Sequence, residues 1–150
     1  MNHARTEIVN VLLVEDSPGD VRLTREAFRE ANGSVVLHVA SDGVEAMLFL
    51  RHQDEYRDSP RPDFILLDLN LPRMDGREVL AHIKADASLR MIPTVILTTS
   101  DADADVLRSY ELNANAYLRK PVTLEAFENL VKSINDFWLT KVVLPVRQPS

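Results

Sequence analysis

The sequence predicts a doubly wound α/β fold with one five-stranded parallel sheet and five helices. Short apolar runs alternate with stretches of helical periodicity, a pattern typical of buried parallel strands joined by crossover helices. Acidic, hydroxyl or lysine residues directly follow four of these runs, at the strand ends where ligands bind in such sheets. The 150 residues, 45% of them hydrophobic, suffice for one domain with a substantial core.

The first two strand-helix units are delimited by capping residues. A strand is expected over Val9–Val14, and Ser17-Pro18 then provides an N-cap followed by proline at the first helical position. This helix is expected to end near Ala31, and the second strand to span Val35–Ala40. Asp42-Gly43 opens the second helix, whose inward-facing residues are predicted to be Val44, Met47, Leu48 and Leu50.

The third unit follows a long polar connection. Residues 51–63 carry two prolines and are expected to form a loop before a strand over Phe64–Leu67. Asp75 and Glu78 then have the spacing of a capping box at the start of the third helix.

The last two units complete the predicted sheet. Strands are expected over Thr94–Leu97 and Ala116–Leu118, with a helix over Ala102–Tyr110 between them. Thr123 caps the final helix, which places apolar residues at helical spacing: Leu124, Phe127, Val131, Ile134 and Trp138. Because crossover connections take one hand, the expected strand order is 2-1-3-4-5, the flavodoxin-like arrangement.

Composition excludes several classes of function. The net charge of −6 without a basic cluster argues against a nucleic-acid partner, and no apolar run is long enough to span a bilayer. There is no cysteine for thiolate chemistry, and neither a glycine-rich phosphate loop nor a secretory signal is present. A cytoplasmic location without membrane contact is expected.

Five side chains are expected to converge on one edge of the sheet: Glu15, Asp16, Asp68, Thr98 and Lys120. Three clustered carboxylates repel one another, and a hard divalent cation such as Mg²⁺ relieves that repulsion. Lys120 and Thr98 can then bind phosphoryl oxygens. The set indicates a metal-assisted phosphoryl site on Asp68.

Each of these residues also has a purely structural interpretation. Glu15 or Asp16 alone could cap the next helix, Thr98 alone could end a strand, and Lys120 alone could be solvated. Their joint occurrence at four strand ends favours the phosphoryl site.

Four segments of the chain resemble the receiver domain of bacterial two-component response regulators. They cover nearly the whole chain in the right order: residues 11–16 (VLLVED), 65–76 (ILLDLNLPRMDG), 96–100 (ILTTS) and 117–121 (YLRKP). The resemblance implies one receiver domain over residues 1–150, with a core of about 8–140 and an apolar extension over 141–150. It also implies a phosphorylated signalling module rather than an enzyme with a substrate of its own.

The resemblance implies a role for each site residue. Asp68 accepts a phosphoryl group from a histidine kinase and assists its own phosphorylation and dephosphorylation together with Lys120. Asp16, Asp68 and the backbone carbonyl of Asn70 hold Mg²⁺, with Glu15 acting through water.

The resemblance also implies a switch. Thr98 and Tyr117 form the switch pair, and the peptide bond from Lys120 to Pro121 is expected to be cis. The output surface is then the fourth helix, fifth strand and fifth helix.

A narrower similarity is to the small stand-alone regulators that pair with bacterial phytochromes. It rests on residues 15–20 (EDSPGD), the long loop through Tyr56 and Pro60, residues 97–100 (LTTS) and residues 136–139 (DFWL). A phytochrome-type histidine kinase is therefore the expected partner. The apolar residues between Phe137 and Pro145 further predict a homodimer formed through the output surface and the C-terminal segment.

Two alternatives compete with this interpretation. A phosphatase of the haloacid-dehalogenase type would also use Asp68 as nucleophile, but it needs a second aspartate where this chain has Asn70. A receiver-like domain with only a structural role is disfavoured, because every residue of the site is present.

Overall fold

A computed structural model of the chain describes residues 8–31, 35–98, 116–120 and 123–134. Its five parallel strands lie in the order β2-β1-β3-β4-β5. Their bounds are β1 Val9–Val14, β2 Val35–Ala40, β3 Phe64–Asp68, β4 Thr94–Thr98 and β5 Ala116–Arg119. The helices are α1 Pro18–Ala31, α2 Gly43–Leu50, α3 Gly76–Ala85 and α5 Leu124–Ile134, with short 3-10 turns η2 Asp54–Tyr56 and η3 Leu89–Met91.

The predicted parallel α/β class is confirmed, with one difference in the number of helices. Within the described residues there are four α-helices where the sequence predicts five. The remaining helix was predicted over residues 102–110, which lie outside the described part of the chain.

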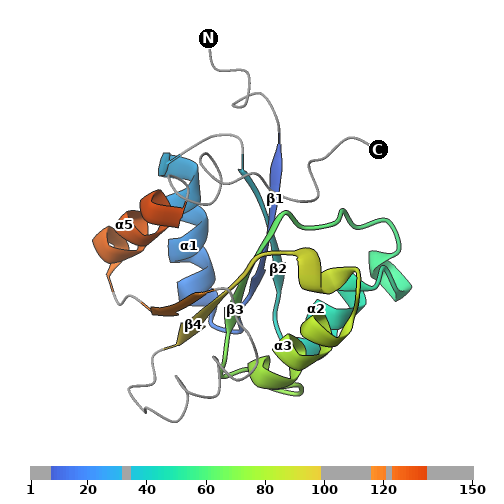
Figure 1. The fold of residues 1–150 in the computed structure, drawn as a ribbon. Helices are drawn as coiled ribbons and strands as arrows, with labels where there is room; N and C mark the ends of the chain where they lie inside the picture. The colour runs from blue at the N-terminus through green and yellow to red at the C-terminus, as the bar shows by residue number, and fades with distance from the viewer. Residues whose placement is uncertain (1–7, 32–34, 99–115, 121–122, 135–150) are drawn as a thin grey trace.

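The helices cover the sheet on both faces, and Figure 1 shows α1 and α5 on one side and α2 and α3 on the other. The central strand β3 is buried along its whole length. Phe64 and Leu66 contribute to the core beneath α1 and α5, whereas Ile65 and Leu67 contribute to the core beneath α2 and α3. A strand buried on both faces has no polar side, which explains its continuous apolar run.

The buried face of α2 differs from the prediction. Ala46 and Phe49 are buried together with Met47 and Leu50, whereas Val44 and Leu48 are only partly buried. The predicted start is confirmed, because the Asp42 side chain accepts a hydrogen bond of 2.8 Å from the Glu45 amide. Nearly every residue of this helix is apolar, so the hydrophobic pattern alone does not determine which side faces inward.

Three strands continue one residue beyond their predicted ends. Asp68 pairs with Leu97 across β3 and β4, and Thr98 pairs with Arg119 across β4 and β5. Asp68 is therefore held by the hydrogen-bonded sheet rather than by the following loop. This places a rigid backbone under one of the candidate site residues.

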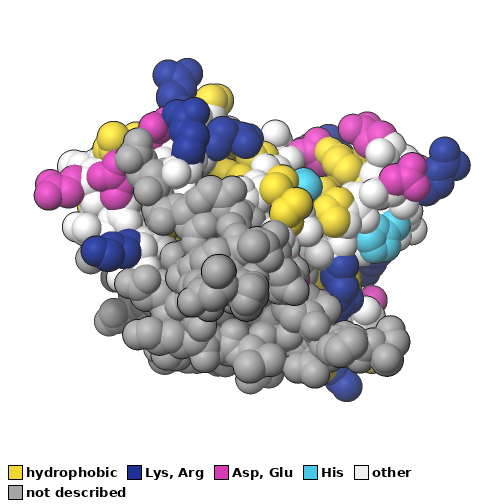
Figure 2. Space-filling view, turned by 90° about the horizontal axis from the view of Figure 1, so that it is seen from above, with side chains coloured by type: hydrophobic (Ala, Val, Ile, Leu, Met, Phe, Trp, Pro, Cys, Tyr) yellow, Lys and Arg dark blue, Asp and Glu magenta, His cyan; other side chains and the backbone are white. Residues whose placement is uncertain are grey.

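The two ends of the sheet differ in character. Figure 2 views the end where the strands begin, and hydrophobic atoms reach its surface there. Ile8, which precedes β1, and Met91, which precedes β4, are 57% and 54% exposed. The candidate site lies at the opposite end. Across the described ranges, no helix has the length and apolar character needed to cross a membrane.

Candidate functional site

Glu15 and Asp16 follow β1 and differ sharply in burial. The Glu15 amide donates to the Ala40 carbonyl at 3.0 Å, which extends the β1–β2 ladder by one residue and carries the Glu15 side chain inward. Glu15 is 2% exposed, whereas Asp16 is exposed. The Ser17 amide donates to Glu15 Oε2 at 3.1 Å and so fixes one carboxylate oxygen. The pair therefore offers one fixed and one solvent-facing carboxylate.

Asp68 ends β3 and is 5% exposed. The backbone N–H of Asn70 donates to Oδ1 of Asp68 at 3.1 Å, and the Lys120 ammonium donates to Oδ2 of Asp68 at 3.2 Å. Both oxygens therefore have a donor, and the side chain has one fixed orientation. Gly76, at the start of α3, keeps the next loop close, because a Cβ there would lie 2.2 Å from the Asp68 carbonyl oxygen.

Lys120 follows β5 and is buried rather than solvated. Its Nζ lies 2.8 Å from Asp20 Oδ2 and 3.2 Å from Asp68 Oδ2, and it also forms an ion pair with Glu15. The ammonium thus joins the ends of β1 and β3 to the first turn of α1.

Glu15 and Lys120 each influence the pKa of the other. Burial raises the pKa of the Glu15 carboxyl to about 7, and the nearby Asp68 charge adds to this although Lys120 opposes it. Burial by itself lowers the pKa of the Lys120 ammonium, but hydrogen bonds to Asp20 and Glu15 and the charge of Asp68 outweigh it, so this pKa is raised. Lys120 therefore remains a cation, while the site still carries an excess of carboxylates.

That excess fits a divalent cation. Glu15, Asp16 and Asp68 each place a carboxylate oxygen within 4.8 Å of the others. Oxygen ligands of this kind suit hard divalent ions, and the exposure of Asp16 leaves a route for a hydrated ion to enter. The donor set is therefore suited to a cation beside Asp68.

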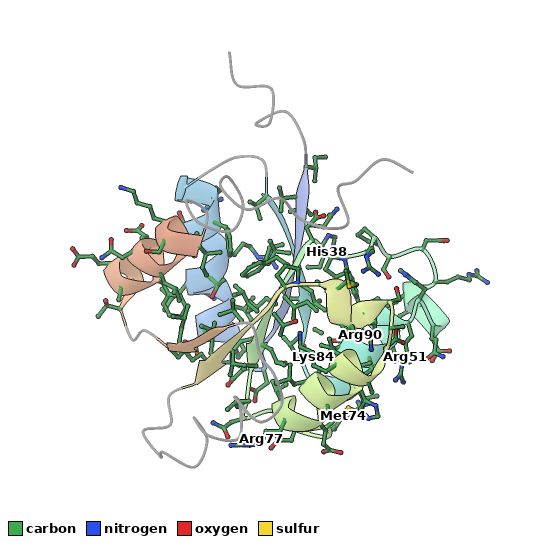
Figure 3. The ribbon with its side chains drawn as sticks, in the orientation of Figure 1. His38, Arg51, Met74, Arg77, Lys84 and Arg90 are labelled. Atoms are coloured by element: carbon green, nitrogen blue, oxygen red, sulfur yellow. The ribbon has the colours of Figure 1, made fainter. Side chains whose placement is uncertain are left out.

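The loop from β3 to α3 borders the site. Figure 3 shows Met74 and Arg77 around the start of α3, in the lower part of the view, and His38, which belongs to the middle of β2, higher in the view. Asp75 caps α3 in the predicted capping box, and the Gly76 amide donates to the Leu69 carbonyl at 3.0 Å. These bonds hold the loop that contains Asn70 against the end of β3.

The structure thus brings together four of the predicted site residues: Glu15, Asp16, Asp68 and Lys120. Asn70 adjoins them through its amide. Thr98 and Tyr117 lie on the neighbouring strands β4 and β5, and their side chains are outside the described part of the structure, as is Pro121 with its predicted cis bond.

Sequence reasoning missed the role of Asp20. The sequence analysis assigns Asp20 no part in the site, yet this residue of the first turn of α1 contacts Lys120. The available signal was its position, since the first turn of a helix that follows a strand lies beside the carboxyl end of the sheet.

The parallel sheet and the acidic site with its buried lysine are the features that the resemblance to receiver domains predicts. The comparison with known families agrees with that prediction. Residues 11–133 match the response regulator receiver domain. The chain belongs to this family. The match leaves the haloacid-dehalogenase alternative without support.

Individual relatives show which members of this family the chain resembles. The chain is 50% identical to response regulator Rcp1 of Synechocystis sp., over 90% of this chain and 92% of that protein. It is 41% identical to a probable methanogenesis regulatory protein, FilR2, of Methanothrix harundinacea, over 86% and 83% of the two chains. These relatives carry the names of regulators rather than of enzymes.

Solved structures give the same result. The Mn²⁺-bound form of Rcp1 aligns with a TM-score of 0.85 at 50% identity, covering 91% of this chain and 99% of that one. The phosphorylated cyanobacterial phytochrome response regulator RcpA aligns with a TM-score of 0.88 at 45% identity, covering 92% and 99%. The chain is therefore similar to phytochrome-associated response regulators.

Proposed function

We propose that this chain is a phosphorylation-activated response regulator in which Asp68 accepts a phosphoryl group from a histidine kinase. The observation that carries the proposal is the contact between buried Asp68 and the Lys120 ammonium, 3.2 Å from Oδ2, beside two further carboxylates. An anionic nucleophile needs positive charge nearby before it can approach an anionic phosphoryl group. Lys120 supplies one positive charge, and the carboxylates can bind a cation that supplies more.

The chain's own residues account for the transfer. A carboxylate oxygen of Asp68 forms a bond to phosphorus while the bond from phosphorus to the kinase imidazole nitrogen breaks, and that nitrogen keeps the electron pair. Lys120 binds a phosphoryl oxygen, and the Asn70 amide orients the Asp68 carboxylate. Thr98 is proposed to donate its hydroxyl to another phosphoryl oxygen. The same groups assist hydrolysis, in which a water oxygen bonds to phosphorus while the bond from phosphorus to Asp68 breaks and the carboxylate oxygen keeps the electron pair.

The proposed cation is Mg²⁺, which would neutralise charge on the transferred group. Asp16, Asp68 and the Asn70 carbonyl are proposed as its ligands, with Glu15 bound through water. Asp16→Ala should weaken Mg²⁺ binding in calorimetry by roughly tenfold or more, because one carboxylate ligand is lost. Asp58→Ala is the control, since Asp58 is exposed in the 51–63 loop. Equal affinity in the parent and Asp16→Ala would contradict this ligand set.

The proposed donor is a phytochrome-type histidine kinase in the cytoplasm. Support comes from the similarity to phytochrome-associated regulators, RcpA among them. Signalling is proposed to proceed through protein contacts, without nucleic acid or membrane as partner, which is consistent with the net charge of −6.

The proposed output joins the switch pair to a dimer. Phosphorylation would draw Thr98 towards the site and let Tyr117 reorient, which changes the surface formed by residues 102–110, β5 and α5. The chain is proposed to be a single receiver domain over residues 1–150, with a core of about 8–140, that forms a homodimer through this surface and the 141–150 extension. Sedimentation as a monomer at tens of micromolar, with and without phosphodonor, would contradict the dimer.

The function itself is tested by phosphotransfer. A radiolabelled phytochrome-type kinase is mixed with the parent chain or with Asp68→Asn, in Mg²⁺ and in excess chelator. Label should pass only to the parent chain with Mg²⁺. Transfer of label to Asp68→Asn at the parental rate would contradict the proposal.

A further inference from the structure

The ammonium of Lys120 has no free hydrogen-bond donor. An ammonium carries three N–H groups, and three carboxylates surround this one: those of Glu15, Asp20 and Asp68. A phosphoryl oxygen can bind Lys120 only if one of these contacts is given up. The identity of the contact that is lost decides how readily the site takes a phosphoryl group.

We propose that Asp20 is a positioning residue that holds Lys120 in the resting site and competes with the phosphoryl group for it. This inference rests on the proposed function and deepens it. Asp20 lies in the first turn of α1, outside the cluster of three carboxylates suited to the cation, and its Oδ2 is closer to Nζ than Asp68 Oδ2 is, at 2.8 Å against 3.2 Å.

Burial identifies Asp20 as the contact that gives way. The side chain of Glu15 is 2% exposed, so releasing it from Lys120 would leave a buried charge without its partner. The side chain of Asp20 is 31% exposed, so water can replace the ammonium there at little cost. Asp68 is the residue that carries the phosphoryl group, and its Oδ2 keeps its contact with Lys120 when the phosphoryl group bonds to Oδ1. Lys120 therefore exchanges Asp20 for the phosphoryl group.

Two physical effects then act in the same direction. Asp20 holds the lysine that the phosphoryl group needs, and its own negative charge repels that group. Replacing Asp20 with asparagine removes the charge and weakens the competing contact while keeping the shape of the side chain. The altered site should bind a phosphoryl mimic more tightly.

Beryllofluoride, which imitates a phosphoryl group on a carboxylate, is the probe, at saturating Mg²⁺. Asp20→Asn should bind it roughly five- to tenfold more tightly than the parent in calorimetry, the effect of about one hydrogen bond of ordinary net strength. Glu26→Gln is the matched control on the same helix, because Glu26 pairs with Arg29 rather than with Lys120. This variant should bind beryllofluoride with the parental affinity. Asp20→Glu, which restores the charge, should return affinity towards the parental value. Equal affinity in Asp20→Asn and the parent overturns the inference.

A double-mutant cycle separates the inference from a role of Asp20 in the helix alone, since an acidic residue in a first turn also stabilises its helix. If Asp20 acts through Lys120, the gain in beryllofluoride affinity from Asp20→Asn should be much smaller once Lys120→Met is present, because only the charge repulsion by Asp20 then remains. An undiminished effect in that background overturns the inference. Failure of the parent to bind beryllofluoride would instead overturn the proposed function, and this inference with it.

Discussion

Gly43 and the carbonyl oxygen of Met74 are in direct contact: a Cβ at Gly43 would lie 2.0 Å from that oxygen. The start of α2 is thereby packed against the loop that leads from Asp68 to α3. An ion pair of 3.5 Å between Asp42 and Arg73 joins the same two segments. Because this loop contains Asn70, a glycine far from the phosphoryl site in sequence helps to set the geometry of that site.

Gly43→Ala is therefore expected to force the two segments apart. The free energy of unfolding should fall by about 1–3 kcal/mol, the usual cost of overpacking, and Mg²⁺ affinity should fall with it. Urea denaturation and calorimetry measure the two quantities. Gly19→Ala is the control, because a Cβ at Gly19 meets only Ser17 Oγ, at 3.9 Å. Parental stability and metal affinity in Gly43→Ala would show that the contact is unimportant.

Lys120→Ala is expected to destabilise the metal-free protein. Removal of the ammonium leaves buried Glu15 and Asp68 without their counter-charge, at a cost of about 3 kcal/mol. Mg²⁺ should stabilise the variant more than the parent, because it replaces the lost positive charge. Lys132→Ala, at an exposed position on α5, serves as the control. If urea titrations without metal gave Lys120→Ala the parental stability, the ion pairs would contribute nothing to the fold.

His38 is expected to make stability depend on pH. Burial lowers the pKa of its imidazole from the ordinary 6.5, and its Nε2 lies 2.9 Å from Asn10 Oδ1. The unfolded chain therefore binds a proton more readily, so this contribution to stability is complete above the ordinary pKa and is lost as pH falls through the folded one.

Unfolding measurements between about pH 7.5 and about pH 5 check this prediction. The parent should lose more stability over that range than His38→Gln, which has no titrating ring. A proton NMR titration of His38 should also give a pKa below the ordinary value. Identical pH profiles for the parent and His38→Gln would refute the prediction.

Much of the fold and site follows from local pattern. Apolar runs ending in Glu15-Asp16 and Asp68 predicted the strands, because a buried parallel strand must be apolar along its length and its ligands lie at its carboxyl end. The Asp42 and Asp75 caps were equally predictable, since capping depends on residues within one turn.

Tertiary contacts were beyond the sequence pattern. The contact of Asp20 with Lys120 joins residues 100 positions apart. An aspartate or a lysine in a sequence does not by itself indicate which residue it will pair with. The buried side of α2 was assigned in part wrongly, because Val44 and Leu48 are as apolar as the residues that face inward. The close approach of Gly43 to Met74 depends on how two segments pack, which composition alone does not encode.

The central claim, that Asp68 carries the phosphoryl group, is tested most directly by locating the modified residue. The chain is incubated with acetyl phosphate and Mg²⁺, reduced with borohydride to convert an aspartyl phosphate to homoserine, and mapped by peptide mass spectrometry. Homoserine is expected at position 68 alone, and at no position when Mg²⁺ is removed by chelation. Homoserine at position 16 or 20, or 2-amino-5-hydroxypentanoic acid at position 15, with Asp68 intact would contradict the account.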